Sequence, residues 1–400
     1  MIIFKETYMK KKNFVVGMVV VLAAALLLFS GCAKKPQVIK IGFNIPLTGD
    51  IPKVGESSKF AAEMMKADIN SAGGLEIGGK KYKVDFIYED NEAKAESAVS
   101  VALKMIEQDK VIGLIGPDSS KQAIPAGEVA NDNKTPMVSP WSTNPATTLN
   151  RPWVFRAAFL DPFQGPVAAN FGTQQFNAKT AAVLFNLDND YSKGLAEYFK
   201  KAFEKLHGAG SVVDYESFGQ NDQDFSVQLT KIISTKPDFL FLPVNYNKVA
   251  LVLPQAIDLG WKNPVLGSDS WGSAELVKLA GNSVKGDYFI THYAAAGAKG
   301  ATKVFIDRYK KKYGYVPDDV AALTWDALGV MTTGLKSMKE LTGNIEKDRK
   351  ALRDGIAGIT SYKGITGTMK FDKNGDPIKS AVVVKVSQDG QFVFEKAVNP

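Results

Sequence analysis

Short apolar runs alternate with segments of helical periodicity along the first part of the chain, and this alternation predicts an α/β protein. The runs are rich in Val, Ile and Phe and are bounded by turn residues, as is typical of strands. The segments between them repeat apolar residues every three or four positions, as Phe60, Met64 and Ala67 do, which favours amphipathic helices. The expected strands are 38–45, 82–90, 111–116 and 135–140, and the expected helices are 55–71 and 94–109.

The same alternation begins again near Phe159 and predicts a second unit of the same kind. Strands joined through helices form parallel sheets with right-handed crossovers, so we expect two doubly wound, Rossmann-like units. The tail from Thr366 alternates apolar and polar residues around Asn374-Gly375 and Asp389-Gly390, which is typical of β-hairpins. The expected strands of this unit are 180–186, 211–218, 238–243, 263–268 and 288–293, and the expected helices are 162–177, 191–206, 224–234, 246–259, 299–313, 318–340 and 345–355.

The N-terminus carries the features of a secretory signal. Lys10, Lys11 and Lys12 precede an uninterrupted apolar run of 16 residues, from Phe14 to Phe29. A stable transmembrane helix usually needs about 20 apolar residues, whereas a positive start and a shorter run are typical of a signal peptide. A signal peptide more usually begins with a methionine directly followed by lysines, as the segment from Met9 does. Met9 is therefore an alternative start of translation.

The segment Leu28-Phe29-Ser30-Gly31-Cys32 resembles a bacterial lipoprotein signal, in which a hydrophobic residue and two small ones precede the lipidated cysteine. Phe29 stands where leucine is usual. The resemblance implies a signal peptide over 1–31, lipidation at Cys32 and a lipidated tether over 32–37. Acyl chains hold a domain on a membrane without a spanning helix, so we expect an exported protein that is lipid-anchored to the cell envelope. The alternative is a plain signal peptide with a chance cysteine.

Composition narrows the possible partners and chemistry. The 400 residues are 45% hydrophobic and 23% charged, which is the balance of a folded protein. The net charge of +7 forms no basic stripe along the sequence, so nucleic acid is not an expected partner. With Cys32 as the single cysteine and His207 and His292 as the two histidines, we expect no disulfide, no metal and no cofactor.

The motifs of common enzymes and calcium sites do not fit this chain. Residues 267–272 do not form Gly-x-Ser-x-Gly, and neither histidine has an obvious partner. Residues 74–81 match the glycine and lysine spacing of a P-loop, but Lys81 replaces the hydroxyl residue that holds Mg²⁺. Segments 188–190 and 372–376 lack the glycine and closing glutamate of a calcium loop. We therefore predict a binding protein without catalytic residues.

Hydroxyl-bearing loops follow two neighbouring strands of the first unit. Ser119 and Ser120 come after the strand at 111–116, and Trp141 and Thr143 come after the strand that begins at 135. Ligands of open α/β sheets bind at the carboxyl ends of the strands, and a serine at a helix start offers hydroxyl and backbone N–H groups to a carboxylate. The simpler alternative is that Ser120 caps a helix and Thr143 sets a turn.

The second unit has its own candidates at the equivalent strand ends. Tyr191 follows the strand at 180–186, Asn245 follows 238–243, and Asp269 follows 263–268. An acid that faces hydroxyl groups across a cleft would suit a ligand with an ammonium beside a carboxylate. The alternatives are that Asp269 caps a helix over 273–279 and that Tyr191 lies on a helix surface.

In this order the motifs resemble the solute-binding lipoproteins of ABC importers, of the leucine/isoleucine/valine-binding type. The resemblance implies the type I periplasmic binding protein fold, with two lobes joined by three hinge segments that close on a small molecule. It implies a lobe 1 of 38–158 and 290–362, and a lobe 2 of 159–289 and 363–400. The matching strings are IKIGFNIPLTGD, ADINSAGG, IGPDSS, TPMVSPWSTNPATT, FRAAFLDPFQG, DQDFSVQLTKI, PDFLFLP and AIDLGW.

The resemblance also implies roles for individual residues. Ser120 and Thr143 would hold the α-carboxylate of an amino acid, helped by the backbone at Trp141. Asp269 would receive the α-ammonium, and Tyr191 would cover the ligand from the second lobe.

Two positions depart from the family pattern. Val54 stands where branched-chain binders have a tyrosine, and Trp141 stands where a small residue is usual. These departures leave the amino-acid head group as the expected ligand feature and leave the side-chain preference open.

The expected function is capture of an amino acid, of the branched-chain type or a related one, and its delivery to the membrane permease of an ABC importer by a monomer. Two alternatives are a ligand of another class (an amide, urea or an aromatic acid) and a ligand-sensing module for a separate receptor.

Overall fold

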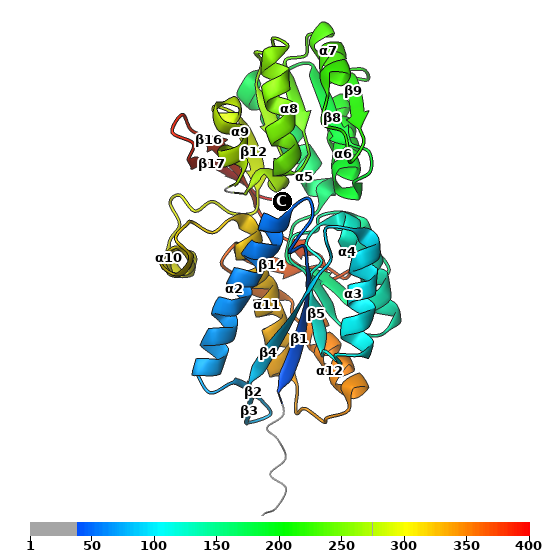
Figure 1. Ribbon diagram of the computed structural model, residues 1–400, viewed down its shortest axis with the longest axis vertical. Helices are drawn as coiled ribbons and strands as arrows, with labels where there is room; N and C mark the ends of the chain where they lie inside the picture. The colour runs from blue at the N-terminus through cyan, green and yellow to red at the C-terminus, as the bar shows by residue number, and fades with distance from the viewer. Residues whose placement is uncertain (1–37, 274) are drawn as a thin grey trace, which may run out of the picture. The chain divides into compact units, whose positions relative to one another are not determined.

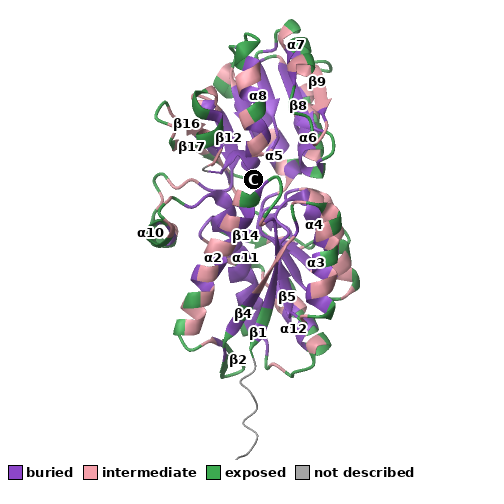
Figure 2. Ribbon diagram, in the orientation of Figure 1, coloured by how far each residue is buried: buried purple, intermediate pink, exposed green. Residues whose placement is uncertain are grey.

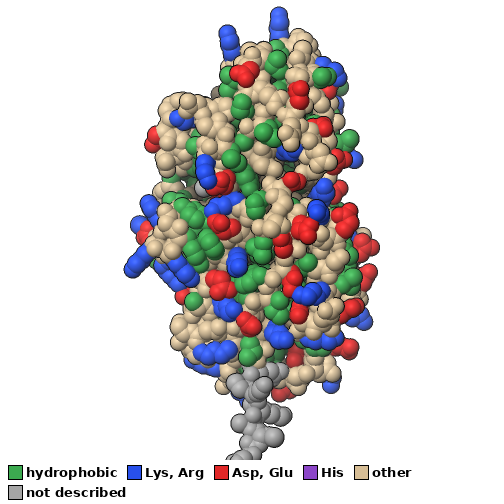
Figure 3. All heavy atoms as spheres, viewed as in Figure 1, with side chains coloured by type: hydrophobic (Ala, Val, Ile, Leu, Met, Phe, Trp, Pro, Cys, Tyr) green, Lys and Arg blue, Asp and Glu red, His purple; other side chains and the backbone are tan. Residues whose placement is uncertain are grey.

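A computed structural model describes residues 38–273 and 275–400 (Figure 1). The signal peptide, the tether and the lipidation predicted at Cys32 lie outside these residues. Among the helices that are described, none combines the length and the apolar character that crossing a bilayer requires. On the face drawn in Figure 3, lysine and arginine side chains are interspersed with aspartate and glutamate.

A five-stranded, entirely parallel sheet has the order β4-β1-β5-β6-β7, and we call this sheet with its helices lobe 1. Helix α11 contacts α2, β5 and β6, so a late part of the chain completes this lobe. The strands are β1 (Ile39–Ile45), β4 (Val84–Asp90), β5 (Gly113–Ile115), β6 (Met137–Ser139) and β7 (Val154–Arg156), and the helices are α2 (Pro52–Ser71), α3 (Ala95–Glu107), α4 (Ser120–Asp132), α10 (Gly300–Tyr313), α11 (Asp319–Ser337) and α12 (Ile345–Ala357).

A seven-stranded sheet has the order β17-β16-β12-β11-β10-β8-β9, and we call it, with its helices, lobe 2. Its middle strands are parallel, and β16 and β17 are added antiparallel at one edge. The strands are β8 (Ala181–Asn186), β9 (Val212–Phe218), β10 (Phe239–Leu242), β11 (Val265–Gly267), β12 (Tyr288–Thr291), β16 (Ala381–Val386) and β17 (Phe392–Val398), and the helices are α5 (Asp161–Phe176), α6 (Asp190–His207), α7 (Ser226–Ser234), α8 (Tyr246–Asp258) and α9 (Glu275–Ala280).

The central strands are buried along their whole length, which explains their uninterrupted apolar runs. Every residue of β5, β6, β8 and β10 is buried, because helices cover both faces of a parallel sheet (Figure 2). The prediction of two doubly wound α/β units is therefore confirmed.

Some elements differ from the sequence prediction. Strand β7 was not predicted, because three residues that end in arginine give no recognisable apolar run. The strand expected at 82–90 is β4 from Val84 onward, whereas Tyr82 ends β3 (Lys80–Tyr82), which forms an unpredicted hairpin with β2 (Leu75–Ile77). A small separate sheet is formed by β13 (Ser361–Gly364), β14 (Gly367–Phe371) and β15 (Pro377–Ile378).

The chain passes between the two sheets three times, at 157–160, 292–299 and 379–380. The resemblance implies a third passage after residue 362, but the chain joins the seven-stranded sheet only at β16. The intervening β13–β15 sheet is tied to lobe 1, since Thr366 donates from its backbone N–H and its hydroxyl to Asp326 of α11.

Candidate functional site

A small cavity, with a volume of about 10 Å³ open to a water molecule, lies between the two lobes, at the carboxyl ends of both sheets. Six of the seven residues predicted from the sequence line it, together with one residue that was not predicted, Ser270. The seventh, Thr143, is not among the lining residues that the structure describes. The lining residues are Ser119, Ser120, Trp141, Tyr191, Asn245, Asp269 and Ser270.

Strand ends explain why these residues meet. Ser119 and Ser120 follow β5 at the start of α4, and Trp141 follows β6. In lobe 2, Tyr191 lies in the first turn of α6 after β8, and Asp269 begins a short 3₁₀ helix (Asp269–Trp271) directly after β11. Loops that follow parallel strands lie along one edge of a sheet, so each lobe presents its polar loops to the other.

Asp269 is the acid of the cavity, and its side chain is surrounded by donors. The Tyr191 hydroxyl donates to Asp269 Oδ1 at 2.5 Å, and Gln164 Nε2 donates to the same oxygen at 2.8 Å. His292 Nε2 lies 3.2 Å from Asp269 Oδ2. Asp269 is only 1% exposed, and this burial raises its pKa to about 7. The carboxyl group therefore changes charge near neutral pH.

Tyr191 is a buried donor rather than a surface helix residue, which was the alternative reading of the sequence. It is 5% exposed, and its hydroxyl also lies 2.6 Å from Ser268 Oγ and 3.2 Å from Ser270 Oγ. Burial and the nearby Asp269 carboxylate raise the pKa of the Tyr191 hydroxyl well above its usual value. The hydroxyl stays protonated and can donate to Asp269.

The lobe 1 side of the cavity is the start of helix α4. Ser119 occupies the N-cap position, but its side chain makes no capping hydrogen bond. Ser120 Oγ lies 2.9 Å from Ser142 Oγ and accepts from the backbone N–H of Asn144 at 3.3 Å, so it ties α4 to the loop after β6. The first backbone N–H groups of a helix attract negative charge, and this end of the cavity is suited to a carboxylate.

Thr143 is fully buried beside Asp161 rather than at the cavity. Its backbone carbonyl accepts from the Asp161 N–H at 3.0 Å. Burial raises the pKa of Asp161 to about 8. Among the described residues, neither the Thr143 hydroxyl nor the Asp161 carboxyl oxygens have a hydrogen-bond partner. The backbone contact connects the loop after β6 with the first residue of α5, where the chain enters lobe 2.

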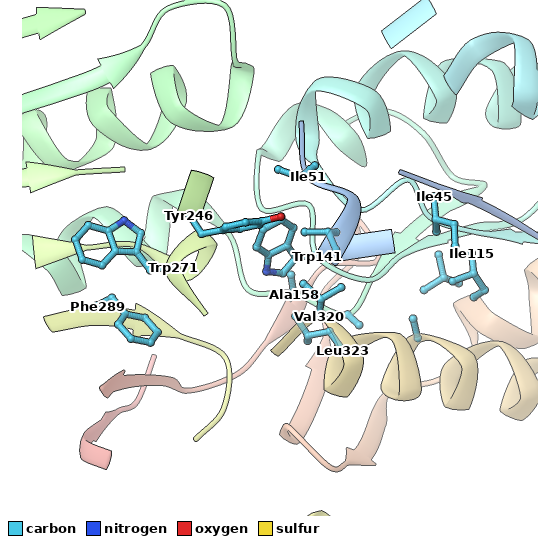
Figure 4. Close-up of a cluster of buried hydrophobic side chains, with 14 of the residues drawn as sticks. Ile45, Ile51, Ile115, Trp141, Ala158, Tyr246, Trp271, Phe289, Val320 and Leu323 are labelled. Carbon is cyan, nitrogen blue, oxygen red and sulfur yellow. The ribbon is translucent and has the colours of Figure 1, made fainter. Parts of the chain in front are cut away.

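Trp141 is held in place by a carboxyl group that the sequence did not identify. Its indole Nε1 donates to Asp319 Oδ2 at 3.1 Å, and the Thr291 hydroxyl donates to the same oxygen at 3.2 Å. Burial and the neighbouring Asp318 and Asp269 carboxyls raise the pKa of Asp319 well above its usual value. Figure 4 shows Trp141 among Tyr246, Ala158, Val320 and Leu323, with which it shares one hydrophobic cluster.

The partners of Asp269 and Trp141 were also missed by the sequence analysis. Gln164 lies in the first turns of α5 and has the appearance of an ordinary helical residue, and Asp319 has the appearance of a helix-start acid. His292 was noted as a histidine without an obvious partner, whereas in the structure it contacts Asp269. In the described part of the chain no three His, Cys, Asp or Glu side chains are grouped as metal ligands.

Comparisons with known proteins place the chain in a family. The profile of the family described as periplasmic binding protein matches residues 38–391. The chain is 28% identical over 357 residues to the leucine-, isoleucine-, valine-, threonine- and alanine-binding protein of Pseudomonas aeruginosa, a match that covers 88% of this chain and 91% of the relative.

Solved structures give the same result. A leucine binding protein from Thermotoga maritima is 31% identical, with a TM-score of 0.82 and coverage of 90% of this chain and 99% of that one. The branched-chain amino acid transporter substrate binding protein of Streptococcus pneumoniae, solved in complex with isoleucine, is 28% identical, with a TM-score of 0.81 and coverage of 91% and 100%.

Proposed function

The chain belongs to the periplasmic binding protein family, and on that premise we propose that it is the extracytoplasmic solute-binding protein of an ABC importer. It captures an amino acid, of the branched-chain type or a related one, and delivers it to the membrane permease without chemical change. The names of relatives that bind leucine, isoleucine, valine, threonine and alanine support this assignment.

The observation that carries the proposal is that an acidic side chain and a set of hydroxyl and N–H donors lie on opposite sides of one cavity. Asp269 of lobe 2 lies on one side, and Ser119 and Ser120 at the start of α4 lie on the other. A zwitterion places its ammonium at the carboxylate and its own carboxylate at the hydroxyl and N–H groups. A neutral amide or urea can donate N–H groups to Asp269, but it brings neither a positive charge for that carboxylate nor a carboxylate for the start of α4, which favours the amino acid.

The position of Thr143 changes its proposed role. Because the Thr143 carbonyl accepts from the Asp161 N–H, we assign Thr143 to holding the loop after β6, and we assign the α-carboxylate to Ser119, Ser120 and the Trp141 backbone. Tyr191 acts as the donor that holds Asp269 in position and as a cover over the ligand.

Binding couples to the relative movement of the lobes in this proposal. A ligand that contacts both lobes stabilises the arrangement in which they are close together, a hinge-type population shift. The three passages at 157–160, 292–299 and 379–380 are the hinge segments. The protein acts as a monomer held at the membrane by lipid on Cys32, where the permease is within reach.

Calorimetry on the purified protein with a panel of amino acids tests the proposal. We expect binding in the micromolar range, which corresponds to about −8 kcal/mol. The variant Asp269→Asn should lose about 2–5 kcal/mol of binding energy, because it removes one partner of a buried charge pair. Asp258→Asn is the matched control, since Asp258 is exposed on α8 of the same lobe.

Two results would contradict the assignment. If Asp269→Asn binds amino acids as tightly as the wild type does, Asp269 does not bind the ligand ammonium. If the wild-type protein binds no amino acid, the proposed ligand class is wrong.

A further inference from the structure

The wall of the interlobe cavity is polar. Five of its side chains carry hydroxyl or amide groups, and Asp269 carries a carboxyl. Trp141 and Tyr191 contribute the ring carbons, and the lining residues that the structure describes include no aliphatic side chain. A leucine or isoleucine side chain binds by removing apolar surface from water, and it needs apolar neighbours to do so. This wall is better matched to a ligand with a short side chain.

The space between these side chains is also small. Its volume open to a water molecule is about 10 Å³, which is about what a single water needs. An amino acid therefore binds only as the lobes move apart, and a short side chain needs less separation than that of leucine or isoleucine.

Trp141 restricts the space that is available to a ligand side chain, because its ring cannot turn aside without breaking a buried hydrogen bond. Its indole Nε1 donates to Asp319, and Thr291 holds the same Asp319 oxygen from the end of β12. Asp319 is itself confined by the backbone of lobe 2, since a Cβ atom added at Gly272 would lie 2.6 Å from Asp319 Oδ1. The ring is also packed in the hydrophobic cluster that contains Ala158, Val320 and Leu323 (Figure 4).

From this geometry we infer that the ligand is a small α-amino acid (glycine, alanine or serine) and that Trp141 is the residue that excludes larger side chains. The inference rests on the proposed amino-acid site and narrows its ligand class. The head group binds at Asp269 and at the start of α4, and the short side chain faces Trp141 and Asn245.

Calorimetry with the wild-type protein tests the inference directly. Glycine, alanine, serine, leucine and isoleucine are titrated at one pH and one salt concentration. We expect at least one of the three small amino acids to bind ten times more tightly than leucine or isoleucine. If leucine or isoleucine binds most tightly, the inference is overturned and the proposed function stands. If no amino acid binds, the proposed function itself fails.

Variants then test whether Trp141 is responsible. Trp141→Ala should raise the ratio of leucine affinity to alanine affinity at least tenfold, and Trp141→Phe should raise it less, because a ring remains. Trp153→Ala is the control, since Trp153 is half-buried, lies beneath Arg353 and does not line the cavity. An unchanged ratio in a folded Trp141 variant, checked by circular dichroism, would overturn the role of this residue. If Trp141→Ala does not fold, Trp141→Phe decides on the same ratio.

Discussion

His292 Nε2 lies 3.2 Å from Asp269 Oδ2, and this contact joins the second passage between the lobes to the acid of the cavity. The His292 ring also stacks on Phe159 of the first passage, with 3.8 Å between the ring centroids. Burial, together with the nearby Lys379 ammonium, holds the pKa of His292 well below its usual value. The ring is therefore neutral, and as the Nε2–H tautomer it donates to Asp269 and favours the carboxylate form.

Replacing His292 should change the pH range in which the protein binds its ligand. His292→Phe keeps a ring against Phe159 but removes the donor to Asp269, so the pKa of Asp269 should rise. We expect the pH midpoint of ligand binding, measured by calorimetry across a pH series, to move upward, and each unit of movement corresponds to about 1.4 kcal/mol. His207→Phe is the control, because His207 lies at the end of α6 and contacts Thr173 of α5 rather than Asp269. An identical midpoint in both variants would show that His292 has no influence on Asp269.

The wild-type protein should bind its ligand less tightly as the pH falls below neutrality. The pKa of Asp269 is raised to about 7 by burial, so the carboxylate that pairs with an ammonium is progressively lost below that pH. Affinity should decrease by at most about tenfold per pH unit between pH 7 and pH 5. Asp269→Asn should show a flat profile over the same range. A wild-type affinity that stays constant or rises on acidification would exclude a charged role for this residue.

Much of the fold could be predicted because its signals are local. Buried parallel strands leave continuous apolar runs, and the order of these runs fixed the two doubly wound units. Strand β7 could not be predicted, because Val154–Arg156 is short and its arginine is paired with Asp376, which lies far along the chain. The β13–β15 sheet likewise depends on its contact with Asp326 of α11, which no local pattern reveals.

The residues of the candidate site also fall into those that the sequence could predict and those that it could not. Residues at the ends of strands could be selected from the sequence, because topology alone places Ser119 at the carboxyl edge of the lobe 1 sheet and Tyr191 and Asp269 at that of the lobe 2 sheet. Their partners could not, since the direction of the Gln164 and Asp319 side chains depends on how helices pack between the lobes. Thr143 shows the limit of the rule: it follows a strand end, but it is not among the residues that line the cavity, and its backbone carbonyl accepts from the Asp161 N–H.

Arg156 is a buried cation that holds several loops near the first passage together. Its Nε lies 2.7 Å from Asp376 Oδ1, and its terminal nitrogens donate to the carbonyls of Ser142 and Asn144 and to the Thr148 hydroxyl. It is fully buried, so removal of the guanidinium leaves the Asp376 carboxylate without its partner in a region of low dielectric.

Arg156→Ala should therefore lower the free energy of unfolding by about 3–5 kcal/mol, measured by urea denaturation. The control is Arg308→Ala, which breaks an ion pair with Asp68 in which both side chains are 43% exposed. Exposed pairs contribute about 0–1 kcal/mol, so this variant should be nearly neutral. Equal effects in the two variants would contradict the structural role given to Arg156.

Gly267 is required because the Trp271 ring lies directly against its backbone, where a Cβ atom would overlap the ring. Trp271 is fully buried and donates from Nε1 to the Leu242 carbonyl at 3.1 Å, so it has little freedom to move. Gly267→Ala should destabilise the fold by about 1–3 kcal/mol, as other overpacked sites do. It should also weaken ligand binding, because the displaced ring ends the same 3₁₀ helix that Asp269 begins.

The control for this substitution is Gly219→Ala, in which the added Cβ atom would meet its nearest neighbours at 3.5 Å, an ordinary contact distance. Thermal unfolding and calorimetry should show Gly219→Ala close to the wild type in both stability and affinity. If Gly267→Ala lost stability but kept full affinity, Asp269 would be held by Tyr191 and Gln164 alone. Loss of both properties together shows that the packing of Trp271 behind β11 sets the position of the acid in the cavity.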